Sequence, residues 1–146
     1  MTPRSPARPP IHATTVAVRR GGGWRGVMIL GASGAGKSDL ALRLTGRGWR
    51  LVSDDYTQVW PSAGALYARA PAAIAGRIEV RGLGIVSVAT RPLVRVALAL
   101  DCAPGPLERL PEPQQRDFAG VRLPLLTLDP RPASAVDVVA AALETL

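Results

Sequence analysis

The stretch Gly26-Val-Met-Ile-Leu-Gly-Ala-Ser-Gly-Ala-Gly-Lys-Ser38 decides the fold of this chain. Its first part, Gly26 to Leu30, is a short apolar run of the kind that forms a strand buried on both faces. The residues from Ser38 to Leu44 repeat apolar side chains at helical spacing, and Gly46 can end the helix. The sequence therefore predicts a strand, a glycine-rich loop and a helix, in that order.

The loop between strand and helix fits G-x-x-x-x-G-K-[ST], a phosphate-binding loop (P-loop). Its glycines let backbone N–H groups turn inward at a helix N-terminus, where the helix dipole also favours an anion. Lys37 is the one lysine against seventeen arginines, and its compact ammonium suits contact with the β- and γ-phosphates of a nucleotide. We expect the Ser38 hydroxyl to bind Mg²⁺. The predicted ATP-binding residues are Gly31, Ala32, Ser33, Gly34, Ala35, Gly36, Lys37 and Ser38.

Length and composition indicate a globular protein with one main domain. The chain has 146 residues, of which 47% are hydrophobic. We expect residues 1–10, rich in Pro and Arg, to be a disordered or extended tail, and residues 11–146 to form the domain. No apolar stretch is long enough for a membrane span or a secretory signal, so we expect no membrane partner and a cytoplasmic location. Cys102, the only cysteine, is expected to be a buried apolar residue.

The charge of the chain is strongly basic, with a net charge of +7 and a sequence pI near 11.2. The arginines are scattered and few aromatic residues are available for base stacking, so we expect no nucleic-acid partner. A solvated basic surface still favours an acidic protein partner or phosphorylated ligands.

The rest of the chain is expected to be rich in strands. We predict a hairpin from residues 13–19 and 26–30, a strand over 50–53, a second hairpin from 57–60 and 65–68, and a loop over 71–76. Further strands are expected over 85–90, 94–101 and 121–128. Val136, Val139 and Leu143 recur at helical spacing, with Ser134 placed to cap that last helix. The predicted fold is a strand-rich α/β domain around a P-loop.

Three acidic residues are candidates for chemistry. Asp54 and Asp55 directly follow the strand over 50–53, where ligands bind in open α/β sheets. In an extended chain their side chains point to opposite sides, which predicts one base for an acceptor hydroxyl and one metal-shell or structural carboxylate. The alternative is a simple turn. Glu79, between arginines and glycines, fits a catalytic loop and a bulged strand equally well.

Three segments together resemble the catalytic domain of HPr kinase/phosphorylase, the bifunctional enzyme of the bacterial phosphotransferase system. They are the P-loop, the continuation Arg47-Gly-Trp-Arg-Leu-Val-Ser-Asp-Asp55, and Ile78-Glu-Val-Arg-Gly-Leu-Gly-Ile85. The resemblance covers residues 11 to 128 and implies a P-loop fold related to that of PEP carboxykinase. It also implies ATP and Mg²⁺ as cofactors, HPr as the protein partner, and a homo-oligomer, a hexamer in the family.

The resemblance also implies roles for single residues. His12 and Lys37 would contact phosphate at the reaction centre, and Asp55 would accept the proton of the target serine. Ser38 and Glu79 would hold Mg²⁺, and Arg109 resembles a later catalytic arginine of the family. The segment from Ile78 to Val88, which includes Arg81 and Gly82, would position the phosphorylated segment of HPr.

The chain also departs from the family. Since its 146 residues leave no room for the amino-terminal domain of longer members, we expect a short form without that domain. Where the family has P-x-R-P-G-R-N, this chain has Ala133, Ser134 and Ala135 in place of Gly, Arg and Asn. We therefore expect a serine kinase of HPr with little phosphorolysis of phosphoserine-HPr. The alternatives are a non-catalytic ATP-binding sensor and a small-molecule P-loop kinase.

Overall fold

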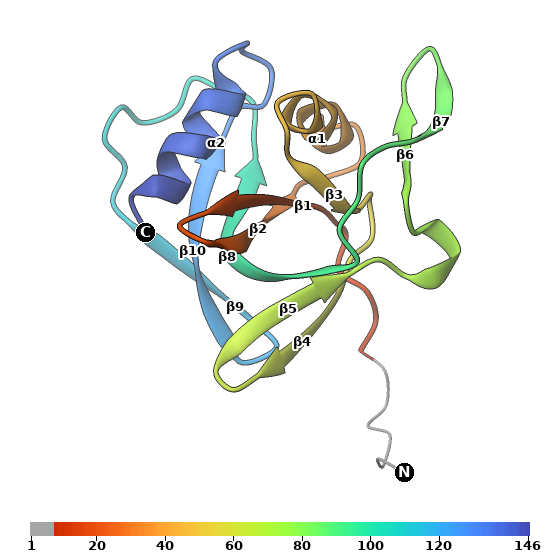
Figure 1. The fold of residues 1–146 in the computed structure, drawn as a ribbon. Coiled ribbons are helices and arrows are strands. Elements are labelled where there is room, and N and C mark those ends of the chain that lie inside the picture. Colours follow the sequence, from red (N-terminus) through yellow and green to blue (C-terminus); the bar gives the residue numbers. More distant parts are fainter. Residues whose placement is uncertain (1–7) are drawn as a thin grey trace.

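The computed structural model describes residues 8–146, which form a large twisted sheet with two helices on one of its faces (Figure 1). Of the predicted tail, residues 1–7 lie outside the described residues, and residues 8–10 are exposed and outside any strand or helix. The elements are β1 (Ala13–Arg20), β2 (Gly23–Leu30), α1 (Lys37–Thr45), β3 (Arg50–Ser53), β4 (Gln58–Ser62), β5 (Ala65–Arg69), the 3₁₀ helix η1 (Ala72–Ile74), β6 (Arg77–Val80), β7 (Gly84–Ser87), β8 (Leu93–Cys102), β9 (Gln114–Phe118), β10 (Val121–Leu128) and α2 (Ala135–Glu144).

Three parallel strands form the middle of the sheet and place the site. The strand order is β3-β1-β2-β8-β10-β9, and the β4–β5 hairpin joins through β5 and β8. Strands β2, β8 and β10 are parallel, whereas β1 and β9 run antiparallel to their neighbours. The carboxyl ends of the parallel strands therefore meet at one edge, and the P-loop follows β2 there. Ligands bind at such an edge in open α/β sheets.

Both faces of the central strands are covered. Helices α1 and α2 pack on one face, where Leu44 and Val139 join Ile29 of β2 in a single apolar cluster. On the other face Met28 packs with Leu66 of β5. This two-sided burial explains why β2 is a continuous apolar run. Among residues 8–146, no helix has the length and apolar character needed to cross a membrane.

Most predicted elements are confirmed, including the β1–β2 hairpin, the helix after the loop, and β3 and β10 with the expected bounds. Two predictions were incomplete and one strand was missed. The strand expected over 85–90 is β7, which ends at Ser87 and pairs with β6. For the segment around Glu79, the sequence had left a loop and a strand equally open, and the structure shows the strand β6. The polar strand β9 was not predicted, and the loop over 71–76 contains η1.

The predicted cap of the last helix is wrong. Ser134 precedes α2, but its backbone is helical (φ −73°, ψ −6°) and its side chain makes no capping hydrogen bond. A capping serine needs an extended backbone to turn its hydroxyl back onto the first turn. Helix α2 is instead held by burial of its apolar face, including Val136 and Leu143.

The pairing of β2 with β8 depends on a missing side chain at Gly26. A Cβ atom there would lie 2.5 Å from Cγ1 of Val94 and 3.0 Å from the carbonyl oxygen of Arg95. We expect Gly26→Ala to lower the free energy of unfolding by about 1–3 kcal/mol, because overpacking forces the strands apart. Urea denaturation measures the change. Gly23→Ala is the matched control in the same strand, because nothing lies within 4 Å of its Cβ, and an equal loss in both variants would contradict the steric explanation.

Candidate active site

The P-loop connects β2 to α1 in a conformation that glycine permits. Gly34 and Gly36 have φ angles of 82° and 97°, and Gly36 is the N-cap of α1 without any side-chain cap. The first N–H groups of a helix have no partners within it, so they remain available at this end. A Cβ at Gly36 would also lie 3.2 Å from Cγ of Pro130. The loop therefore offers uncapped backbone donors for an anion.

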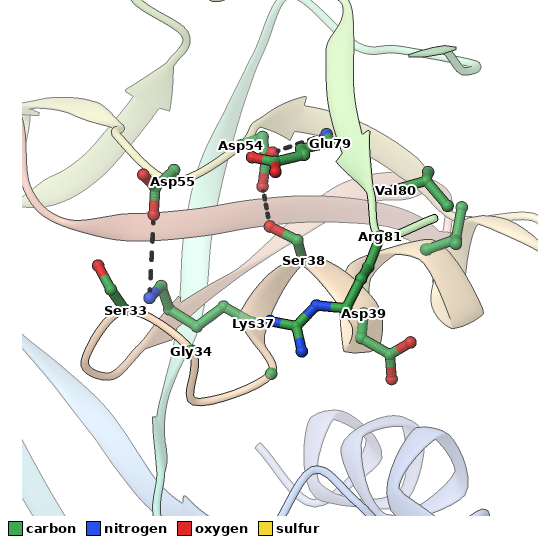
Figure 2. A pocket seen from close by; sticks show the side chains of 12 residues that line it. Ser33, Gly34, Lys37, Ser38, Asp39, Asp54, Asp55, Glu79, Val80 and Arg81 are labelled. Carbon is green, nitrogen blue, oxygen red and sulfur yellow. Dashed lines mark hydrogen bonds and ion pairs between the residues drawn. The ribbon is translucent and has the colours of Figure 1, made fainter. Parts of the chain in front are cut away.

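The lysine of the loop is almost fully buried, with 4% of its surface exposed. Its Nζ donates to the carbonyl oxygens of Gly31 at 2.9 Å and Ala32 at 3.1 Å. The same Nζ lies 3.9 Å from Oδ1 of Asp55, as the dashed line in Figure 2 marks. Lys37 is thus fixed between the loop backbone and the carboxylate that follows β3.

Asp54 is a buried carboxylate that joins three elements. Its Oδ1 accepts hydrogen bonds from the hydroxyls of Ser38 at 2.5 Å and Thr14 at 3.2 Å. Its Oδ2 accepts from the backbone N–H of Glu79 at 3.1 Å, and Figure 2 marks the contacts with Ser38 and Glu79. The contacts link α1, β1 and β6 through one side chain that is 9% exposed. The carboxylate therefore holds the P-loop serine in place and anchors β6.

Asp55 has a different environment. Its side chain is 47% exposed, and Oδ1 lies 2.8 Å from Nε2 of His12, whose ring stacks on Tyr56. The expectation of an extended chain was wrong, because Asp55 has a φ of 64°, in the left-handed region. Its backbone N–H donates to Oγ1 of Thr14 at 3.0 Å. The two acids still separate, one toward Ser38 and the other toward His12 and Lys37.

A cavity of about 520 Å³ lies between the P-loop, the two acids and the end of β6, and His12 reaches it only through its contact with Asp55. Arg81 reaches from the end of β6 toward the P-loop, and Glu79 lies on the same strand beside Asp54 (Figure 2). Gly82, with a φ of 85°, follows Arg81 in the turn between β6 and β7. The residues that line the cavity are Ser33, Gly34, Gly36, Lys37, Ser38, Asp39, Leu42, Asp54, Asp55, Glu79, Val80 and Arg81.

The oxygen ligands in the cavity fit Mg²⁺ bound together with a nucleotide. The Ser38 hydroxyl and the Asp54 and Glu79 carboxylates are hard oxygen donors of the kind that this ion prefers. Within residues 8–146, no group of three or more His, Cys, Asp or Glu side chains is placed to hold a metal by itself. This set fits Mg²⁺, which usually takes one or two carboxylates and completes its shell with phosphate oxygens and water.

Two arginines lie outside this arrangement. Arg109 is exposed in the segment between β8 and β9 and does not line the cavity, so its catalytic role stays a prediction. Arg131 donates through Nε and Nη2 to both carboxylate oxygens of Asp129. These hydrogen bonds, with the backbone N–H groups of Arg131 and Gly105, hold the pKa of Asp129 below its ordinary value. Two N–H groups of the Arg131 guanidinium are therefore engaged by Asp129.

Sequence reasoning missed Thr14, which is fully buried and binds both acids, one through its hydroxyl proton and the other through its hydroxyl oxygen. The available signal was a pair of threonines in a strand that is otherwise apolar at its core. A buried hydroxyl needs a hydrogen-bond partner, so such a residue indicates a polar group across the strand.

The cysteine behind the P-loop is expected to be unreactive in the folded protein. Burial raises the pKa of the Cys102 thiol to about 11, and a Cβ at Gly31 would lie 3.2 Å from Cβ of Cys102. The thiol is neutral below that pH, so we expect alkylation by iodoacetamide at pH 8.5 to be about 100-fold slower than in urea, where the pKa returns to about 8.5. Equal rates in both conditions would contradict the burial of this residue.

Comparisons with known proteins agree with this fold. The chain is 49% identical to an HPr kinase/phosphorylase of Clostridium beijerinckii over 65 residues, 44% of this chain and 22% of that protein. It is 36% identical to HPr kinase/phosphorylase 1 of Oceanobacillus iheyensis over 132 residues, 78% of this chain and 41% of that protein. The chain thus matches less than half the length of these relatives.

A solved structure and a family model complete the comparison. The HPr(Ser) kinase/phosphatase of Coxiella burnetii superposes with a TM-score of 0.80 over 94% of this chain and 95% of that chain, at 23% identity, which shows a shared fold. The model of the HPr serine kinase C-terminal domain matches residues 8–91. Since this match covers more than half of the 146 residues, and since the resemblance noted in the sequence is thereby confirmed, the chain belongs to the HPr serine kinase C-terminal domain family.

Proposed function

We propose that this chain transfers the γ-phosphoryl group of Mg-ATP to a serine of the phosphocarrier protein HPr. The observation that carries the proposal is the position of Asp55, whose Oδ1 lies 2.8 Å from His12 and 3.9 Å from Nζ of the P-loop lysine. A nucleotide-binding protein without transfer chemistry has no need of a half-exposed carboxylate at the phosphate end of the loop. The family membership and the named relatives support the same reaction.

Different residues of the cavity would have different roles in phosphoryl transfer. The N–H groups of the P-loop and Lys37 would hold the phosphates, and Ser38, Asp54 and Glu79 would hold Mg²⁺. The bound ion would supply positive charge beside the phosphate oxygens. Apart from Lys37, Arg81 is the only basic residue that lines this cavity within residues 8–146. Its guanidinium would therefore stabilise the negative charge on the phosphoryl group during transfer.

The acceptor serine would approach from the side of Asp55. This carboxylate would orient the hydroxyl and accept its proton as the new O–P bond forms. His12, hydrogen-bonded to Asp55, would fix the orientation of the carboxylate and contact the transferred phosphate. The β6–β7 hairpin contributes Glu79, Val80 and Arg81 to the cavity lining, and its far end exposes Leu83 and Ile85 at 73% and 70%. We propose that this hairpin positions HPr.

The test is to incubate the protein with Mg-ATP and the HPr of the same organism, and to measure the mass of HPr. We expect HPr to gain one phosphoryl group on a serine, and HPr with that serine replaced by alanine to gain none. ATP binding without any gain in mass would support the sensor alternative instead. A hexamer, suggested by the resemblance, would be measured in the same sample by sedimentation velocity.

The reverse reaction is expected to be weak. Ala133, Ser134 and Ala135 supply no cation, and Arg131 is already paired with both oxygens of Asp129. One missing charge-assisted contact of about 1.5–3 kcal/mol lowers a rate roughly tenfold to a hundredfold. We therefore expect phosphoserine-HPr and millimolar phosphate, without ATP, to release pyrophosphate at least about tenfold more slowly than the forward rate. Equal rates would show that another group binds the incoming phosphate.

A further inference from the structure

The hydroxyl of Thr14 in β1 is not explained by packing. Thr14 is fully buried and pairs with Ile29 of β2, which belongs to the apolar cluster under helices α1 and α2. The next side chains on the same face of β1, those of Val16 and Val18, belong to this cluster too. A valine at position 14 would have nearly the same shape and would bury no polar atom. The hydroxyl therefore calls for another explanation.

This hydroxyl joins the two acids of the site in a fixed direction. An ionised carboxylate only accepts hydrogen bonds, so the single proton of the Thr14 hydroxyl points to Oδ1 of Asp54 at 3.2 Å. The hydroxyl oxygen then accepts the backbone N–H of Asp55 at 3.0 Å. Because Oδ1 of Asp54 also accepts from the hydroxyl of Ser38, one line of hydrogen bonds runs from the P-loop serine to the backbone of Asp55.

The backbone of Asp55 has a conformation that needs such support. Its φ of 64° lies in the left-handed region, which is costly for a residue with a side chain. The N–H of Tyr56 donates to the carbonyl oxygen of Asp54 at 2.7 Å and closes a tight turn around Asp55. Within residues 8–146, the Thr14 hydroxyl is the only hydrogen-bond partner of the Asp55 N–H. Removing the hydroxyl would leave this N–H unpaired in the turn.

From these contacts we propose that Thr14 is a positioning residue, which holds the carboxylate of Asp55 beside Lys37 and in reach of the acceptor hydroxyl. The inference rests on the function proposed above, in which Asp55 is the base. Thr14 touches no reacting group and acts through the backbone of Asp55. A small displacement of a catalytic group is enough to slow a reaction strongly. Since Asp54 would keep its bonds to Ser38 and Glu79, loss of the Thr14 hydroxyl should affect transfer more than Mg-ATP binding.

Three single variants separate the hydroxyl from the rest of the side chain. Thr14→Val removes the hydroxyl and keeps the shape, whereas Thr14→Ser keeps the hydroxyl. The matched control is Thr15→Val, because Thr15 is also fully buried in β1 but its hydroxyl contacts that of Thr57 instead of an acid. Urea unfolding first shows that each variant is folded, and Thr14→Ala replaces Thr14→Val if the valine variant is not.

The first readout is the hydrogen exchange of the Asp55 backbone N–H, followed by NMR without nucleotide, which requires no activity. We expect exchange about tenfold faster in Thr14→Val, because the N–H loses its partner, and near the wild-type rate in Thr14→Ser and Thr15→Val. An unchanged rate in Thr14→Val would overturn the proposal, whether or not HPr is a substrate.

The second readout is the kinetics of HPr phosphorylation. Thr14→Val should lower kcat about 10–100-fold and change the KM for Mg-ATP less than about twofold, and Thr14→Ser should restore most of the rate. Added to Asp55→Asn, Thr14→Val should slow transfer no further, because no base is left to position. A further loss of the same size would overturn the proposal. If the wild type fails to phosphorylate HPr, the proposed function is wrong, and hydrogen exchange alone decides whether Thr14 holds Asp55.

Discussion

Replacing Asp55 by asparagine is expected to slow phosphoryl transfer to HPr by about 10²–10⁴-fold while Mg-ATP still binds. Asparagine keeps the size of the side chain and tolerates the left-handed backbone, with its φ of 64°, that this position requires. The variant therefore loses the base without losing the local fold. The measurements are the transfer rate by mass spectrometry and ATP affinity by calorimetry.

Asp54→Asn is the matched comparison, one residue earlier in the chain. An amide has only one acceptor oxygen for the three donors that now converge on Asp54, those of Ser38, Thr14 and Glu79. We expect this variant to unfold at a lower temperature and to need more Mg²⁺. Wild-type transfer rates in both variants would mean that the acidic pair only makes a turn.

Replacing Lys37 by arginine is expected to weaken ATP binding about 100-fold or more, although the charge is kept. The ammonium is 4% exposed and fits between the carbonyl oxygens of Gly31 and Ala32. A planar guanidinium is too broad for that space, so the arginine side chain would either displace the loop or turn out of the site. Calorimetric titration with Mg-ATP measures the loss.

The reverse exchange, Arg50→Lys, serves as the control, because Arg50 is exposed at the start of β3 and outside the cavity lining. Its ATP affinity should equal that of the wild type. Thermal unfolding of Lys37→Arg must also be recorded, so that loss of binding is separated from loss of folding. A folded Lys37→Arg protein with normal ATP affinity would contradict the identification of residues 31–38 as an ATP-binding P-loop.

The central elements of the fold could be predicted because their sequence signals are local. The run from Val27 to Leu30 is buried on both faces, and β10 keeps its predicted bounds. Strand β9 was missed because it is a polar strand at the edge of the sheet, where only Phe118 is buried. Its pairing with β10 depends on the fold around it, which residues 114–118 do not encode by themselves.

The site could be predicted only where its residues lie close together in the sequence. The P-loop residues could be identified from the spacing of the motif, and Asp54 and Asp55 from their position directly after a recognisable strand. The contact of Thr14 with both acids joins positions about forty apart in the chain, and the local pattern of threonines indicates a polar partner without saying which one. The pairing of Arg131 with Asp129 likewise appears only in three dimensions.

The β6–β7 hairpin belongs to no larger sheet, because its strands pair only with each other. It is attached to the body through the buried Ile78 and the hydrogen bond from Glu79 to Asp54. Two-stranded hairpins contribute little stability of their own. Replacing the exposed residues of its far end, such as Leu83 and Ile85, is therefore expected to cost little folding stability. Substitutions at these two positions can therefore probe what the hairpin binds while the catalytic groups beneath it stay in place.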